Sequence, residues 1–247
     1  MATGEMSFWE HLDELRAAVV RSLVVVGVLA VVAFCLKEPL FRWVLAPRSS
    51  DFATWRLLGV EPFSIHLMNT GLTEQFFIHV SVSLYAGLLL GSPWVLYELF
   101  RFVSPALYAG ERRVAVPVVV VAYVMFLLGV ALCYLLVFPL TVRFLGTYQV
   151  SPDVENMLTL QSYVDTFISM SLVVGVVFEL PVVCWLLGRM GLVSGQLMRR
   201  YRRHAIVAIL VVAAVITPTT DVLTLLVVSL PIWVLYEVSI FVVGYRK

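Results

Sequence analysis

The segment that decides the fold is residues 162–189, SYVDTFISMSLVVGVVFELPVVCWLLGR, an apolar run that carries Glu179 and Pro181 in its second half. About 20 apolar residues, at ~1.5 Å rise per residue, cross the ~30 Å hydrocarbon core of a bilayer. If Arg189 marks the membrane surface, Glu179 lies ten residues deeper, roughly 15 Å into the lipid. The segment therefore predicts a transmembrane helix with a carboxyl group inside the membrane.

The environment of Glu179 is the first question that this helix raises. A carboxyl at that depth costs about 2.5–3.5 kcal/mol on insertion scales, so the side chain should face protein or water. Two interpretations stay open: Glu179 is protonated and bonded to a neighbouring helix, or it recognises a partner. Pro181 leaves the carbonyl of Val177 without its helical partner and predicts a kink beside the acid.

Composition supports a membrane protein with several spans. Hydrophobic residues make up 61% of the chain and charged residues 13%, against about 45–50% and 25% in soluble proteins. The 17 basic and 16 acidic residues nearly balance, which gives no reason to expect a nucleic-acid partner. Cys35, Cys133 and Cys184 lie far apart in apolar runs, so they are interpreted as small hydrophobic residues, and no metal, cofactor or redox pair is expected.

Outward from this segment, the apolar runs predict six spans, at about residues 18–36, 76–96, 114–138, 163–188, 205–216 and 222–243. The fifth offers only 12 apolar residues, roughly 18 Å of helix, and Pro231 interrupts the sixth. Gly87 and Gly91 in the second span have the small-xxx-small spacing that lets a neighbouring helix approach closely, and Pro93 should bend that helix near its end.

The N-terminal residues 7–16 predict a short interfacial helix that leads into the first span. Apolar residues recur along one side at helical spacing, and acidic residues fill the other side. Glu10 and Asp13 are assigned to its solvated face. The acidic start differs from the basic start of a cleavable signal peptide, so the first apolar run is expected to remain as a span.

The distribution of basic residues predicts the orientation. Segments 1–21, 97–113, 189–204 and 244–247 together hold twelve Lys and Arg, whereas the predicted outer loops 37–75, 139–162 and 217–221 hold five. Because cytoplasmic loops carry the excess of Lys and Arg, both termini are expected on the cytoplasmic side.

The motifs of common enzymes are missing from the sequence. It contains no P-loop, HExxH or GxSxG pattern, which argues against an enzyme. Two classes remain: a proton-coupled small-solute transporter that uses Glu179 as a relay, or a receptor that binds other membrane segments. Spans one to three and four to six differ in length and proline placement, which counts against a transporter built from inverted repeats.

Several motifs resemble the family of the twin-arginine translocase receptor subunit, TatC. Residues 7–16, SFWEHLDELR, resemble its N-terminal signature. The stretch that reads SPWVLY at 92–97, FVSPALY at 102–108 and ERR at 111–113 is similar to its most distinctive region. FELP at 178–181 matches its fourth span, and Thr217-Pro218 its last outer turn. The likeness covers nearly the whole chain in order.

This resemblance implies an all-α integral protein of the bacterial cytoplasmic (inner) membrane, with six transmembrane helices in a concave, glove-like bundle. It implies a receptor for the twin-arginine signal peptides of folded cargo proteins. Glu14 and Glu111 would form the signal-peptide site, with Phe102 as its aromatic wall and Leu15, Arg16, Arg112 and Arg113 beside them. A carboxylate can accept a bidentate guanidinium, which a lysine cannot reproduce. From the residues alone, Glu111 could instead pair with a nearby arginine, and Phe102 could simply pack the turn.

The resemblance also implies partners and two further groups of residues. Glu179 and Pro181 would line a concave face where single-span TatA/TatB-type subunits dock. Pro47, Thr217, Pro218 and Asp221 would lie at outer turns, although Asp221 could equally cap the last helix. The implied assembly is a homo-oligomer within a larger complex in the lipid bilayer. Transport would be driven by the proton-motive force, without a cofactor or catalytic residue.

The chain departs from the family pattern at two places. The outer turn, Thr-Pro-Thr-Thr-Asp at residues 217–221, is one residue longer than the common form, and Leu225 stands where many members carry glutamine. Neither departure touches the implied signal-peptide site.

Overall fold

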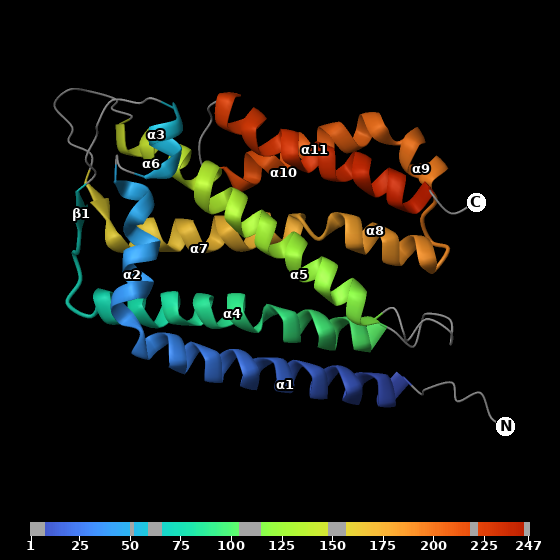
Figure 1. Ribbon diagram of the computed structural model, residues 1–247, viewed down its shortest axis with the longest axis horizontal. Helices are drawn as coiled ribbons and strands as arrows, with labels where there is room; N and C mark the ends of the chain where they lie inside the picture. Colours follow the sequence, from blue (N-terminus) through green and yellow to red (C-terminus); the bar gives the residue numbers. More distant parts are fainter. Residues whose placement is uncertain are drawn as a thin grey trace.

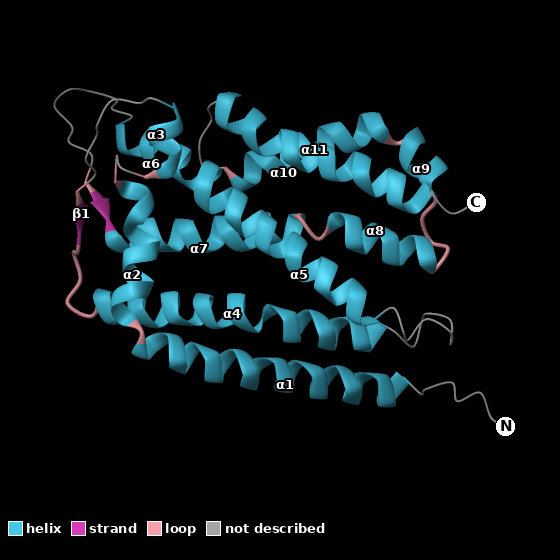
Figure 2. Ribbon diagram, in the orientation of Figure 1, coloured by secondary structure: helices cyan, strands magenta, loops and turns pink. Residues whose placement is uncertain are grey.

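The computed structural model describes residues 8–49, 52–58, 66–103, 115–147, 157–217 and 222–244, and these segments are almost entirely helical (Figure 2). Within them, five helical stretches are long and apolar enough to cross a membrane. These are Trp9–Cys35, Glu74–Val103, Val116–Thr147, Leu160–Arg189 and Thr224–Gly244. The chain is therefore mostly helical and carries several apolar helices of membrane-spanning length.

Helices α1 (Phe8–Cys35) and α4 (Glu74–Val103) lie side by side along one edge of the bundle (Figure 1). They contact each other more extensively than any other pair of described elements. A Cβ atom added to Gly87 would lie 2.6 Å from the backbone nitrogen of Ala30, and one on Gly91 would lie 3.1 Å from Val26. The predicted small-xxx-small motif is thus the place where the two backbones meet.

Two ends of the bundle can be distinguished in Figure 1. We call the end that holds the first residue of α1 and the last residues of α4 and α11 (Val222–Gly244) the terminal end. The opposite end, which we call the far end, holds the short helices α2 (Lys37–Leu45) and α3 (Ala53–Leu58).

Helix α1 differs from the sequence prediction. A short helix at 7–16 was expected before a separate span at 18–36, but α1 continues without a break from Phe8 to Cys35. The residues at the expected junction are Ala17 and Ala18, and alanine has the highest helix propensity. Nothing in the local backbone therefore ends the helix where its polarity changes.

Helix α4 also runs further than predicted, through Pro93 to Val103. Proline has no N–H, so the carbonyl of Leu89 loses its helical partner. The hydroxyl of Ser92 donates to this carbonyl at 2.8 Å. This local substitute keeps the helix continuous, and it carries α4 seven residues past its predicted end at 96.

A second proline organises the helix that begins with α5 (Ala115–Leu132). A π-helical turn, η4 (Cys133–Val137), joins α5 to α6 (Phe138–Thr147), so the outer loop predicted from 139 begins as helix. Pro139 leaves the carbonyl of Leu135 without its usual partner four residues on. The hydroxyl of Thr54, from α3, donates a hydrogen bond to this carbonyl. The contact attaches α3 to the end of the long helix.

The far end is held by aromatic residues. The hydroxyl of Tyr134 donates to the carbonyl of Trp43 at 2.8 Å, and that of Tyr163 donates to the carbonyl of Val44 at 3.0 Å. Two strands of two residues each, β1 (Leu67–Met68) and β2 (Leu158–Thr159), pair in parallel beside this cluster. Such a short pairing has no periodic pattern in the sequence, and the all-α prediction did not include it.

Helices α7 (Leu160–Val177) and α8 (Leu180–Arg189) form the central layer, which α5 crosses diagonally (Figure 1). A Cβ atom on Gly129 would lie 2.9 Å from the Cα atom of Gly175, so the crossing of α5 and α7 also depends on glycine. The helix breaks between α7 and α8, as the kink predicted at Pro181 requires.

The last layer contains α9 (Gly195–Arg200), α10 (Arg202–Ile216) and α11. With 15 residues, α10 is shorter than the five long stretches. Helix α11 continues through Pro231, where an interruption was predicted. Arg202 and Glu237 form an ion pair of 2.6 Å that joins α10 to α11.

The close approach at Gly87 can be tested by one methyl group. We expect Gly87→Ala to lower the free energy of unfolding by about 1–3 kcal/mol, because the added carbon would push against the backbone of α1. Gly27→Ala is the control, since nothing lies within 4 Å of a Cβ atom there. Thermal unfolding in detergent measures both variants, and equal midpoints would contradict the close packing.

The bond between α3 and η4 predicts the behaviour of a second variant. Thr54→Val keeps the shape of the side chain but leaves the partly buried carbonyl of Leu135 without its donor, so we expect a loss of about 1–3 kcal/mol. Thr147→Val removes an exposed hydroxyl that bonds within its own helix and should cost much less. Thermal unfolding compares the two, and a larger effect of Thr147→Val would be the contrary result.

Candidate functional site

The candidate site lies at the terminal end, between the start of α1 and the end of α4. The rings of His11 and Phe102 stack with centroids 4.2 Å apart and planes inclined by 18°. Leu15 and Phe102 line the same groove between the two helices. The structure therefore brings together Leu15 and Phe102, two residues that the sequence assigned to one site, and Glu14 directly precedes Leu15 in α1.

The groove between α1 and α4, which we call the α1–α4 groove, has a volume of about 310 Å³. Apolar side chains make up most of its described lining: Leu15, Ala18, Val19, Leu23, Val26, Leu88, Val95, Leu99 and Phe102. Ser22 and Glu98 are the polar exceptions. A hollow of this composition suits an apolar segment.

The sequence did not predict the ion pair that Glu98, a residue of this groove, forms with Arg21. Arg21 of α1 donates two parallel hydrogen bonds to Glu98 of α4, from Nε to Oε1 at 2.9 Å and from Nη2 to Oε2 at 2.7 Å. The side chain of Glu98 is only 3% exposed, whereas that of Arg21 is 40% exposed. The signal in the sequence was an arginine near the start of the first apolar run and a glutamate just past the end of the second, where an unpaired charge would be costly.

Glu14 differs from Glu98 in its partners. One of its carboxylate oxygens, Oε2, is buried and has no hydrogen-bond partner in the part of the chain that the structure describes. Arg16, two residues later, is exposed. Glu111, Arg112 and Arg113, which the sequence assigned to the same site, lie outside the described residues. The described part of the site therefore contains one buried carboxylate oxygen, Oε2 of Glu14, without a hydrogen-bond partner among the described residues.

Glu179 lies at the break between α7 and α8, directly before the first residue of α8, and Pro181 is the second residue of that helix. Its Oε1 atom is buried and has no hydrogen-bond partner among the described residues. The side chain does not cap α8. One interpretation of this acid was a hydrogen bond to a neighbouring helix. In the described part of the chain, Oε1 of Glu179 makes no such bond.

A second apolar hollow, of about 180 Å³, contains Glu179. Its other described lining residues are apolar and come from α4, α5 and α8: Leu96, Leu99, Phe100, Val103, Val118, Val119, Ala122, Val182, Val183 and Leu186. Leu99 lines this hollow and the α1–α4 groove alike. The hollow that contains Glu179 and the α1–α4 groove are thus both bordered by helix α4.

The residues predicted at outer turns lie elsewhere. Pro47 is buried in the short helix η1 (Ala46–Arg48) at the far end. Thr217 is also buried, and its hydroxyl donates to the carbonyl of Ala213 at 2.8 Å. Pro218 and Asp221 lie outside the described residues, so the two interpretations of Asp221 both stay open.

Another acid, Asp165, was not singled out from the sequence. It lines two hollows between α4 and α7, of about 370 and 570 Å³, and Ser81 lines both as well. Asp165 is exposed near the far end of α7. Its position in the same apolar run as Glu179 was the available signal.

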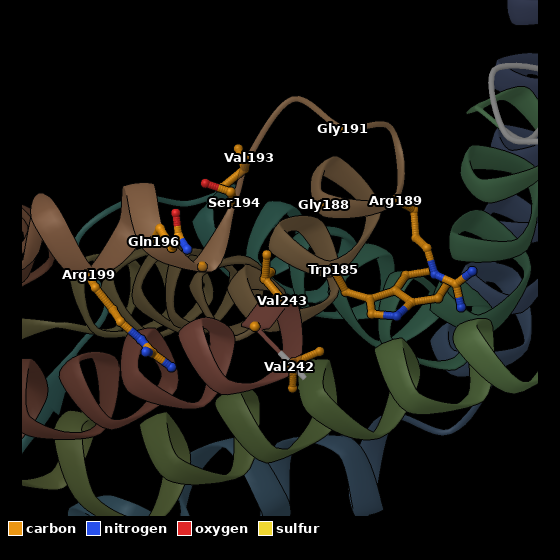
Figure 3. Close-up of a pocket in the computed structure, with 12 residues that line it drawn as sticks. Trp185, Gly188, Arg189, Gly191, Val193, Ser194, Gln196, Arg199, Val242 and Val243 are labelled. Atoms are coloured by element: carbon orange, nitrogen blue, oxygen red, sulfur yellow. The ribbon is translucent and has the colours of Figure 1, made fainter. Parts of the chain in front are cut away.

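A large hollow at the terminal end, of about 570 Å³, lies between α8, α9 and α11 (Figure 3). The guanidinium carbon of Arg189 lies 4.9 Å from the centre of the Trp185 ring, and Arg199 projects from α9 on the other side. None of the predicted site residues that the structure describes lines this hollow. Within the described segments, no group of three or more His, Cys, Asp or Glu residues is placed to hold a metal ion.

Comparison with known proteins places the chain in a family. The profile of the family described as "Sec-independent protein translocase protein (TatC)" matches residues 10–231. A protein of that name from Desulforapulum autotrophicum is 39% identical over 243 residues, which cover 97% of this chain and 86% of the relative. One from Koribacter versatilis is 35% identical over 235 residues, and the match covers 95% of this chain and 84% of the relative.

Solved structures agree with this assignment. A structure described as "Crystal Structure of Twin Arginine Translocase Receptor- TatC in DDM" has a TM-score of 0.76 and 29% identity, and the match covers 94% of this chain and 98% of that one. A second structure of a twin-arginine translocase receptor has a TM-score of 0.71 and 30% identity. The chain therefore belongs to the TatC family of Sec-independent protein translocase proteins, membrane components of the twin-arginine transport system.

Proposed function

We propose that this chain is the receptor subunit of a twin-arginine export machinery in the cytoplasmic membrane of a bacterium. It binds the twin-arginine signal peptides of folded cargo proteins and recruits single-span TatA/TatB-type subunits for their transport. Both termini lie in the cytoplasm, because the segments at the terminal end carry most of the Lys and Arg residues. Pro47, Thr217, Pro218 and Asp221 then belong to the opposite side of the membrane.

The short helix α10 completes six spans in this proposal. Its 15 residues reach only about 22 Å at 1.5 Å per residue, less than the ~30 Å hydrocarbon core. A span of this length requires a thinner bilayer or flanking residues that reach toward the surface, and Arg202 and Arg203 lie at its start. With α11 beside it, α10 forms the edge of a concave bundle.

The observation that carries the proposed receptor function is the open carboxylate of Glu14. Its Oε2 atom has no partner in the described chain, and it lies at the terminal end next to Leu15, which lines the α1–α4 groove with Phe102. A guanidinium would satisfy that oxygen with a charge-assisted hydrogen bond. Glu111 supplies the second carboxylate, with Arg16, Arg112 and Arg113 nearby, so that two adjacent arginines are each bound.

Glu179 provides the contact for single-span partners. Its unpaired oxygen faces an apolar hollow, so a transmembrane helix with one polar donor would match both the apolar walls and the carboxyl group. The receptor then acts as one of several copies in a larger complex, and the proton-motive force drives transport. Membership of a protein translocase family favours this role over the small-solute transporter, which the sequence alone left open.

The signal-peptide site predicts the effect of two substitutions. We expect Glu14→Ala and Glu111→Ala each to weaken the binding of a twin-arginine signal peptide by at least about tenfold, because a charge-assisted hydrogen bond is worth about 1.5–3 kcal/mol. Glu111→Arg should abolish binding, since it adds a like charge. Fluorescence anisotropy of a labelled peptide with the purified protein measures the dissociation constant.

Asp13→Ala is the matched control for this experiment. Asp13 is an exposed acid next to Glu14 on α1, so its removal changes the net charge equally but leaves the candidate site intact. A peptide in which Lys-Lys replaces Arg-Arg should bind weakly to the wild-type protein. Unchanged binding of the twin-arginine peptide to both alanine variants would refute the site.

Substitution of Glu179 should change the amount of single-span partner subunits that co-purify with the protein. We expect Glu179→Gln to retain most of the co-purified single-span subunits, because an amide keeps a hydrogen-bonding group in the apolar hollow. Glu179→Leu should lose them, and Glu179→Lys should lose them most completely. Asp165→Asn, a change of another acid in the same apolar run, serves as control. Equal recovery of partners with Glu179→Leu would show that they dock elsewhere.

A further inference from the structure

The pair formed by Arg21 and Glu98 has the same chemistry that a twin-arginine receptor uses. A guanidinium forks onto a carboxylate with two parallel hydrogen bonds, at 2.9 and 2.7 Å. Both oxygens of Glu98 are engaged, and its side chain is only 3% exposed. A glutamate in this state has no oxygen left for a second guanidinium at the same geometry.

The position of the pair connects it with the proposed site. Glu98 is the charged residue in the described lining of the α1–α4 groove, which also contains Leu15 and Phe102. Arg21 lies seven residues after Glu14, two helical turns along the same side of α1, and Glu14 attracts it electrostatically. One arginine of the chain therefore binds one carboxylate, Glu98, and is attracted by a second, Glu14, which has an unpaired oxygen.

We propose that Arg21 determines specificity at the proposed signal-peptide site by occupying Glu98, so that Glu14 is the open carboxylate on this side. The inference rests on the function proposed above. Arg21 is a positioning residue: it does not touch the peptide, but it prevents the deeper acid from capturing a cationic side chain in the wrong register. It also lowers the negative charge of the groove, which otherwise attracts any basic peptide.

A simpler role for the pair is to join α1 to α4. In that case, removal of either partner leaves a buried or partly buried charge uncompensated, and both variants lose stability and peptide binding together. If Arg21 instead acts by occupying Glu98, the two variants should change peptide binding in opposite directions: removal of Arg21 should tighten it, and removal of the Glu98 charge should weaken it. Arg21→Lys keeps the positive charge, but lysine cannot make two parallel hydrogen bonds to Glu98. This variant therefore separates the occupation of both Glu98 oxygens from a general effect of charge.

The test measures the dissociation constants of a twin-arginine peptide and a Lys-Lys peptide, together with the midpoint of thermal unfolding. We expect Arg21→Gln to bind the twin-arginine peptide about two- to fivefold more tightly, since the free energy of a partly exposed ion pair corresponds to a factor of this size. The same variant should also bind the Lys-Lys peptide more tightly. Glu98→Gln releases Arg21 toward Glu14 and should weaken binding to a similar extent. The double variant Arg21→Gln/Glu98→Gln should bind within about twofold of the wild type.

Arg21→Lys is the decisive variant, because the net charge does not change. We expect it to tighten binding of the twin-arginine peptide about twofold, since one oxygen of Glu98 becomes available. Arg202→Gln is the control: it removes an arginine from the ion pair between α10 and α11 and should leave peptide binding unchanged. Weaker binding in Arg21→Gln, or no change in Arg21→Lys, would overturn the inference.

The outcomes also separate this inference from the proposed function. If the wild-type protein does not distinguish the twin-arginine peptide from the Lys-Lys peptide, the receptor function itself is wrong. If it does, but Arg21→Gln and Glu98→Gln both weaken binding in step with their unfolding midpoints, the pair only joins the helices. In that second case, Glu14 and Glu111 keep their proposed role and Arg21 has none in specificity.

Discussion

The contact of the α1 and α4 backbones at Gly87 is the constraint on which the terminal end of the molecule depends. A Cβ atom there would lie 2.6 Å from the backbone of Ala30, so no other residue allows the same distance between the helices. Because helices are stiff, this one crossing sets their register over their whole length. It places Arg21 opposite Glu98 and His11 opposite Phe102. The candidate site is therefore a consequence of helix packing in the membrane interior.

Helix α4 connects the two candidate acids. One side of it forms the α1–α4 groove with Glu98, and Leu99 also lines the hollow that contains Glu179. Under the proposed function, a signal peptide and a single-span partner would thus both contact α4.

Prolines in this chain act according to what replaces their missing hydrogen bond. The hydroxyl of Ser92 satisfies the carbonyl that Pro93 leaves open, and the helix continues. Thr54, far away in sequence, does the same for Pro139. At Pro181 the helix instead breaks, and the break places Glu179 with an unpaired oxygen in an apolar hollow. Proline positions alone predicted the kink at Pro181, where the helix breaks, but they also predicted an interruption at Pro231, where α11 continues.

The sequence by itself determined the helical, membrane-embedded class of the protein, the glycine motif at the α1–α4 contact and the family. These follow from apolar length, local spacing and short motifs, which are properties of neighbouring residues. It also named Leu15 and Phe102, which the structure brings together in one groove, whereas Glu111, Arg112, Arg113, Pro218 and Asp221 lie outside the described residues. Only the tertiary structure decided that Arg21 occupies Glu98, 77 residues away, and that Thr54 bonds to Leu135. Such pairs depend on the register between helices, which long-range packing sets and no local pattern contains.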